Sequence, residues 1–118
     1  MIQSLKPNQI FIFGSNLAGQ HIGGAAKQAL EQFGAIMGQG EGMQGQSYAF
    51  PTLNDRFDRL SREDLLKSVK ILKFCAENNP DKEFLLTRVG TGIAGYSEEY
   101  MNELLKDLPS NIIRIWKI

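Results

Sequence analysis

The chain has little of several features that would point to a particular class of protein. It has one cysteine, Cys75, in 118 residues, which excludes an internal disulfide and a zinc site made of several thiolates. Thirteen basic and thirteen acidic residues cancel, so there is no broad positive field to attract nucleic acid. No apolar run approaches the length of a membrane span, and the polar segment MIQSLKPNQ is unlike a signal peptide. We therefore expect a cytoplasmic protein with no metal site, no separate cofactor and no membrane contact.

The length suits one domain, residues 1–118, and the pattern of apolar residues predicts an α/β fold. Strands are expected at 9–13, 47–50, 83–89 and 111–117, and helices at 25–33, from 61 to an end near 78–80, and from 97 onward. Residues 38–45 are expected to form a loop, Pro51 to end the second strand, and Ser61 and Ser97 to cap helices. Strands alternating with helices predict a mainly parallel sheet with helices on both faces, a three-layer α/β/α arrangement. The last strand is expected at an edge of this sheet, because Arg114 and Lys117 interrupt it.

Two glycine-rich segments are the most informative part of the sequence. Residues 10–24 (IFIFGSNLAGQHIGG) and 85–96 (LLTRVGTGIAGY) each leave an apolar strand and enter a helix. Glycine lets backbone N–H groups approach a ligand closely, and the start of a helix adds its positive dipole end. Because the carboxyl ends of parallel strands meet at one edge of a sheet, we expect both turns to hold one phosphate-bearing ligand there.

The first turn, from Gly14 to Gly24, contains neither a GxGxxG fingerprint nor a GxxxxGK[ST] loop, so it favours neither a dinucleotide site nor a magnesium-dependent NTPase. It offers Ser15 and Asn16, and the only histidine, His21. That histidine is either a general acid or base or a solvent-exposed polar residue, and exposure is the favoured interpretation. The alternative for the whole turn is that its glycines only permit a tight connection.

The second turn offers the Thr91 hydroxyl, the amides from Gly92 to Gly95, and the Tyr96 ring as a wall. The alternative is a tight connection with Tyr96 as a half-buried core ring. Glu41 and Asp55 are further titratable candidates near the expected mouth of the site. Cys75 falls on the apolar stripe of a helix and is expected to be an inert core thiol.

Three stretches resemble the macro domains, a family that binds ADP-ribose and related nucleotides and includes hydrolases of ADP-ribosyl esters and ADP-ribose phosphates. They are FIFGSNLAGQHIGGAAKQAL, GEGMQGQSYAFPT and LLTRVGTGIAGYSEEYMNELL. The resemblance implies a macro-like fold in which Asn16 contacts the distal ribose, Gly23 and Gly24 lie beneath it, and residues 91–95 wrap the diphosphate. Tyr96 would line the ribose or adenine side. In a hydrolase, Asn16 would orient the ribose, a water held by the diphosphate would attack, and His21 would carry a proton.

The ligand-binding residues predicted in this way are Gly14, Ser15, Asn16, Gly23, Gly24, Thr91, Gly92, Ile93, Ala94, Gly95 and Tyr96. The chain also departs from the family. The strand and acidic residue that recognise adenine in macro domains are replaced by the short segment MIQSLKPN, which leaves the base specificity open. The paired asparagines usual in the hydrolases are reduced to GSN, which leaves catalysis open.

Two alternatives remain. The chain could be a nonenzymatic interaction protein that oligomerises, with glycines that only form turns and a working surface made by Arg56, Phe57, Arg59 and Leu60. It could also be a Rossmann-like enzyme acting on a nucleotide sugar or a cytokinin-related compound, for which Glu41 is the sole acidic candidate in a glycine-rich loop. The sequence leaves the oligomeric state open.

Overall fold

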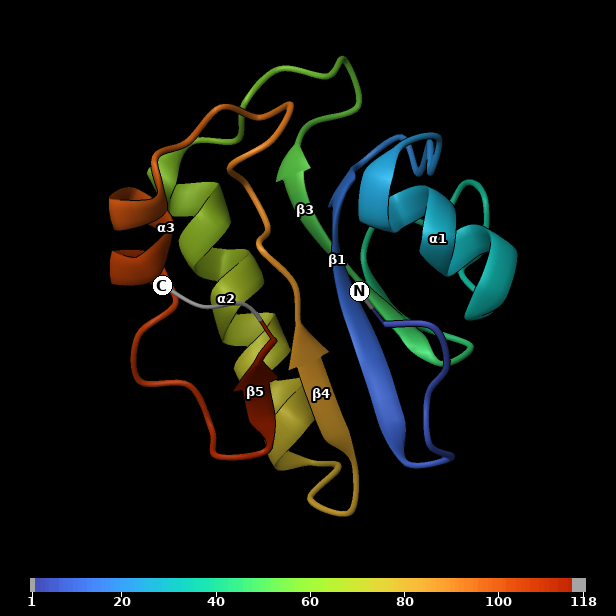
Figure 1. Ribbon diagram of the computed structural model, residues 1–118. Helices are drawn as coiled ribbons and strands as arrows, with labels where there is room; N and C mark the ends of the chain where they lie inside the picture. Colours follow the sequence, from blue (N-terminus) through green and yellow to red (C-terminus); the bar gives the residue numbers. More distant parts are fainter. Residues whose placement is uncertain (1, 116–118) are drawn as a thin grey trace.

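A computed structural model describes residues 2–115 of the chain as an α/β fold with one five-stranded sheet and three helices (Figure 1). The elements in chain order are β1 (Gln9–Asn16), α1 (Gly24–Gln32), β2 (Gly42–Gln44), β3 (Ser47–Leu53), α2 (Arg62–Glu77), β4 (Glu83–Leu86), α3 (Glu98–Leu104) and β5 (Ile112–Arg114). The predicted alternation of strands and helices is confirmed, with β2 added between the first helix and the second predicted strand.

The strands lie in the order β2-β3-β1-β4-β5. The central strand β1 pairs in parallel with β3 and β4, and β5 pairs in parallel with β4, whereas β2 runs antiparallel to β3. The predictions of a mainly parallel sheet and of an edge position for the last strand are therefore confirmed.

The structure corrects two predictions in the middle of the chain. Residues 42–44 are not loop but strand β2, because the Gly45–Gln46 turn folds them back onto β3, with Gly45 at φ +60°. Pro51 does not end β3, which continues to Leu53. Proline lacks a backbone N–H, but β2 pairs with β3 only as far as Ala49, so Pro51 has no strand partner on that side.

The last two strands are shorter than predicted. Strand β4 ends at Leu86 because Thr87 turns its hydroxyl onto the Ile12 carbonyl at 2.7 Å and accepts a hydrogen bond from the Val89 amide at 2.8 Å. Strand β5 covers residues 112–114 and leaves out Asn111 and Ile115, and the predicted residues 116 and 117 lie outside the described part of the chain.

The residues of β1 alternate between two core clusters. Phe11 and Phe13 pack with the small residues Ala26 and Ala29 of α1. The neighbouring residues of β1 pack with α2 and α3 in a larger cluster, whose members from these elements are Ile10, Ile12, Leu65, Val69, Leu72, Met101 and Leu104. Alternating side chains of a strand point to opposite sides of a sheet, so β1 contributes to both clusters.

The helix starts differ in how they are capped. Ser61 and Ser97 accept hydrogen bonds from the amides of Asp64 and Tyr100, both at 3.1 Å, as predicted for N-cap residues. Helix α1 starts after Gly23, which provides no capping side chain. Among residues 2–115, no helix is long and apolar enough to cross a membrane.

Candidate functional site

The sheet topology places both glycine turns at one point. Strands β1 and β4 are neighbours, but the chain leaves them in opposite directions across the sheet. After β1 it continues to β3 on one side of this pair, and after β4 it continues to β5 on the other side. Ligands of open α/β sheets bind at the carboxyl ends of two such strands. Gly14 in β1 lies beside Val89 and Gly90, since a Cβ at Gly14 would be 3.7 Å from the Val89 Cβ and 3.8 Å from the Gly90 nitrogen. The expectation that the two turns share one edge is confirmed.

The polar side chains at the end of β1 are occupied by local contacts. Ser15 is buried and donates its hydroxyl proton to the Gly40 carbonyl. The Asn16 side chain makes two hydrogen bonds to the backbone of Gln20. Its Oδ1 accepts from the Gln20 backbone N–H and its Nδ2 donates to the Gln20 carbonyl, each at 3.0 Å. These side chains shape the first turn and fasten it to the loop before β2.

His21 is buried completely, so the favoured interpretation of a solvent-exposed histidine is wrong. Its Nε2 lies 3.0 Å from the Gln39 carbonyl, and its ring meets the Phe13 ring edge-on at 4.9 Å between centroids. A carbonyl can only accept, so Nε2 carries a proton and donates it to Gln39. Nδ1 has no partner among the described residues. His21 joins two loops, and its role as a proton carrier stays a prediction.

The end of the first turn is open. A Cβ at Gly23 or Gly24 would meet nothing within 4 Å, and Gly24 adopts φ +56°. The amides of Gly24, Ala25 and Ala26 form the first turn of α1 and make no hydrogen bond within residues 2–115. Unsatisfied donors at a helix start, together with the helix dipole, favour an anion at this position.

The second turn also presents free donors. Of the amides from Gly90 to Tyr96, only those of Gly95 and Tyr96 find acceptors in the described part of the chain, on Gly92 at 3.0 Å and on Gly90 at 2.9 Å. A Cβ at Gly92 would meet nothing within 4 Å, and Ile93 at the tip is 92% exposed. The backbone between these residues is therefore accessible from outside.

The second turn contains the spacing GxGxxG at residues 90–95, a signal that the sequence interpretation missed. In a dinucleotide fold this motif opens directly into a helix, and an acidic residue follows the next strand. Here α3 begins only at Glu98, and β5 ends at Arg114 and is followed by Ile115 rather than by an acidic residue. The spacing is thus consistent with a phosphate turn but lacks the rest of the dinucleotide pattern.

Tyr96 is a buried core residue, more deeply buried than the half-buried ring of the alternative interpretation, and its role as a ligand wall stays a prediction. It is 8% exposed, donates its hydroxyl proton to the Leu60 carbonyl, and stacks on Tyr100 with 5.3 Å between ring centroids. Burial raises the pKa of its hydroxyl, the nearby Tyr100 raises it further, and Arg59 opposes this. Arg59 covers the other face of the ring at 4.9 Å and donates to the Ala94 and Gly95 carbonyls at 2.8 and 3.0 Å. The sequence interpretation missed Arg59 as the residue that holds this turn.

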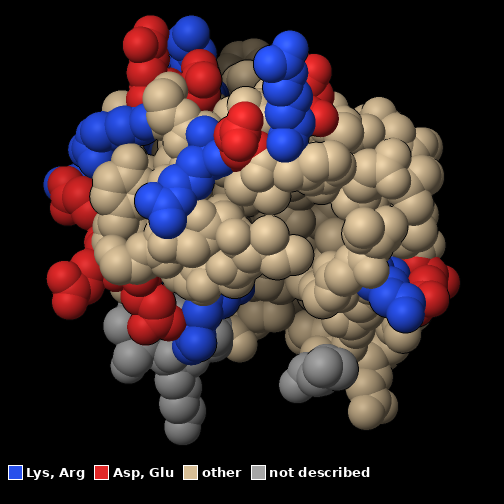
Figure 2. All heavy atoms as spheres, turned by 90° about the horizontal axis from the view of Figure 1, so that it is seen from above, with Lys and Arg blue, Asp and Glu red and all other residues tan. Residues whose placement is uncertain are grey.

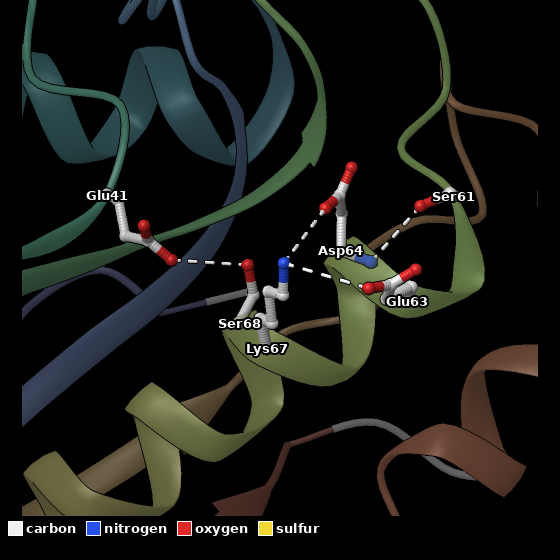
Figure 3. A network of polar contacts seen from close by, with 6 residues as sticks. All are labelled: Glu41, Ser61, Glu63, Asp64, Lys67 and Ser68. Atoms are coloured by element: carbon white, nitrogen blue, oxygen red, sulfur yellow. Dashed lines mark hydrogen bonds and ion pairs between the residues drawn. The ribbon is translucent and has the colours of Figure 1, made fainter.

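The predicted interaction surface is divided by the fold. Leu60 is buried and Arg59 is engaged by the second turn, so only Arg56 and Phe57 project freely. The titratable candidates are also separated. Asp55 is exposed beside Arg56, whereas the Glu41 carboxylate accepts a hydrogen bond from Ser68 of α2 at 3.2 Å (Figure 3). The Glu41 carboxylate therefore faces α2.

An open groove of about 540 Å³ runs along α1 from the first turn of that helix, and Lys27 and Glu31 of α1 also line it. Its walls include Gly24 and Ala25 from the first turn of α1, Thr87 after β4, Phe11 of β1 and Ile115 after β5. This size is in the range of small-ligand sites. The groove joins the first turn to the end of β4 but does not reach residues 91–96; Thr91 lines a separate space of only about 10 Å³.

A larger groove of about 600 Å³ lies between α2 and α3 and contains none of the predicted site residues. Part of its charge is neutralised locally. Lys67 reaches toward both Glu63 and Asp64 (Figure 3), at 3.9 and 4.0 Å. Lys106 lies 3.0 Å from Glu103. Such exposed pairs contribute little energy and do not mark a site.

The carboxyl edge of the sheet is mostly uncharged. Seen from above, most charged side chains gather on the side of α2 and α3, a smaller charged group lies at the opposite side, and the surface between them is uncharged and hollowed near its middle (Figure 2). Residues 14–26 and 89–97 contain no Lys, Arg, Asp or Glu. An anion at the two turns would therefore be held by backbone N–H groups. Within residues 2–115, no three His, Cys, Asp or Glu side chains converge as a metal site would require.

Comparisons of the chain with protein-family models, with curated proteins and with solved structures find no match.

Proposed function

We propose that this protein binds ADP-ribose or a related nucleotide diphosphate at the carboxyl ends of β1 and β4, in a three-layer α/β/α fold of the macro type. One observation carries the proposal. Two neighbouring parallel strands with diverging connections each continue into a glycine-rich turn with unsatisfied amides, and a groove of about 540 Å³ opens at the end of the first turn. The two core clusters, one with α1 and one with α2 and α3, support the layered arrangement.

The chemistry of the donors supports a phosphate group as the recognised part. The amides of Gly24, Ala25 and Ala26 point out of the start of α1, and the second turn adds the amides of residues 90–94. Backbone amides and a helix start can hold a phosphate without a lysine or arginine. The proposal concerns binding. Hydrolysis stays a prediction, because Asn16 and His21 are both engaged in internal contacts.

Thermal-shift measurement and calorimetry with ADP-ribose, NAD and AMP test the proposal. Gly92 offers a matched pair of variants, since its Cβ direction is open and its φ is not positive. We expect Gly92→Ala to fold and bind as the parent does, and Gly92→Glu to fold but lose most of its affinity, because its carboxylate repels the diphosphate. An absence of binding at millimolar ligand, or equal affinity for the Glu and Ala variants, would count against the proposal.

A further inference from the structure

In the connection between β3 and α2, residues 54–58 form a short arm at the carboxyl edge of the sheet. Leu53 and Arg59 bridge its base in antiparallel fashion. Asn54 makes three hydrogen bonds within the arm. Its side-chain Oδ1 accepts from the backbone N–H groups of Arg56 at 2.8 Å and Asp58 at 3.0 Å, and its backbone N–H donates to the Asp58 carbonyl at 2.8 Å. The arm is therefore a fixed structure rather than a loose loop.

Phe57 at the tip of this arm has an unfavourable backbone conformation. Its φ is +66°, and Asp107 is the only other non-glycine residue among residues 2–115 with a positive φ. A bulky residue is strained in this region, whereas asparagine, aspartate and glycine accept it readily. The Phe57 side chain is 51% exposed, so core packing does not offset the strain. Strained residues that persist without a packing benefit occur at functional sites.

The base of the arm is bonded to both glycine turns. The Leu17 amide of the first turn donates to the Leu53 carbonyl at 3.0 Å. The Arg59 guanidinium donates to the Ala94 and Gly95 carbonyls of the second turn at 2.8 and 3.0 Å. Figure 1 shows this connection rising above the end of β3 at the carboxyl edge. The arm is therefore fixed to both turns, and Phe57 is its only aromatic residue.

We propose that Phe57 is the base-binding residue of the site, and that its ring stacks on the flat base of the nucleotide held by the two turns. This inference rests on the proposed function. A phenyl ring has no hydrogen-bonding group for a phosphate, and the adjacent Asp55 and Asp58 repel one, whereas any nucleobase presents a face that stacks on an aromatic ring. Arg59 acts as a positioning residue, because it fixes the arm to the second turn.

Three variants of Phe57 test the inference, measured by calorimetry with ADP-ribose and by thermal unfolding without ligand. Phe57→Gly removes the ring and suits the positive φ, so we expect a higher unfolding temperature together with an affinity about 5- to 100-fold weaker. Phe57→Tyr keeps an aromatic face and is expected to bind within about twofold of the parent. Phe57→Leu keeps an apolar side chain without the ring and is expected to bind as weakly as the Gly variant.

The outcomes separate this inference from the proposed function. A parent protein that binds no nucleotide refutes the proposed function and the inference with it. A parent that binds ADP-ribose while Phe57→Gly binds equally well refutes the inference alone. A Leu variant with parental affinity would also refute stacking, because a general apolar contact would then be sufficient.

Discussion

Gly23, the N-cap residue of α1, allows stability and ligand binding to be changed in opposite directions by one substitution. It has the extended conformation of an N-cap, φ −151° and ψ 157°, and its Cβ direction is open. In Gly23→Asp the carboxylate can accept from the free amides of the first turn and interact with the helix dipole. The cap adds a few tenths of a kcal/mol and the dipole about 0.3–1 kcal/mol, so we expect a gain of about 1 kcal/mol.

A gain of this size corresponds to an unfolding temperature about 3–6 °C higher for a chain of this length. The same carboxylate occupies the amides that we assign to the phosphate. Two like charges about 4 Å apart repel by about 1 kcal/mol in water and about 4 kcal/mol at an effective dielectric constant of 20. Since about 1.4 kcal/mol is a factor of ten in affinity, the variant should bind ADP-ribose at least about fivefold more weakly.

Gly23→Asn is the matched control, because it caps the helix without adding a charge. It should gain a few tenths of a kcal/mol and bind more tightly than the Asp variant. The difference in affinity between the two variants should shrink in about 1 M salt, where the screening length is about 3 Å. Equal affinity of the parent and the Asp variant would show that the phosphate does not lie at the start of α1, and a lower unfolding temperature would contradict the open geometry at Gly23.

Two further predictions concern stability alone. Tyr48 is 1% exposed and its hydroxyl has no partner among the described residues, so Tyr48→Phe should raise the free energy of unfolding at pH 7 by about 1 kcal/mol in denaturant titrations. Burial, with Cys75 and Glu41 nearby, raises the pKa of this hydroxyl. The folded chain therefore keeps the proton that the unfolded chain loses above about pH 10, and the parent should lose stability there by up to about 1.4 kcal/mol per pH unit relative to the Phe variant. A parallel pH dependence of the two proteins would contradict this. A Cβ at Gly40 would lie 2.3 Å from the Asn16 carbonyl oxygen, so Gly40→Ala should lower the free energy of unfolding by about 1–3 kcal/mol or more. Gly92→Ala, at an open position, should change it by less than about 0.5 kcal/mol. Equal unfolding temperatures of these two variants would refute the close approach at Gly40.

The sequence predicted those elements that local chemistry dictates. Ser61 and Ser97 cap their helices as expected, since an N-cap bond joins residues three apart. The end of β3 was predicted wrongly, because Pro51 is tolerated only where the neighbouring strand β2 has already ended. That neighbour was itself missed, since a three-residue strand has too few residues for a recognisable pattern.

In the candidate site, too, some features follow from the local sequence and others from contacts between distant segments. The sequence by itself determined that two glycine-rich turns follow apolar strands and that neither turn has a charged side chain, because these properties belong to the residues alone. Only the tertiary structure decided that β1 and β4 are neighbours, that His21 is buried against Gln39, and that Arg59 holds the second turn 35 residues further on. Strand order, burial and long-range hydrogen bonds depend on contacts between segments far apart in the chain, and local patterns of residues do not encode them.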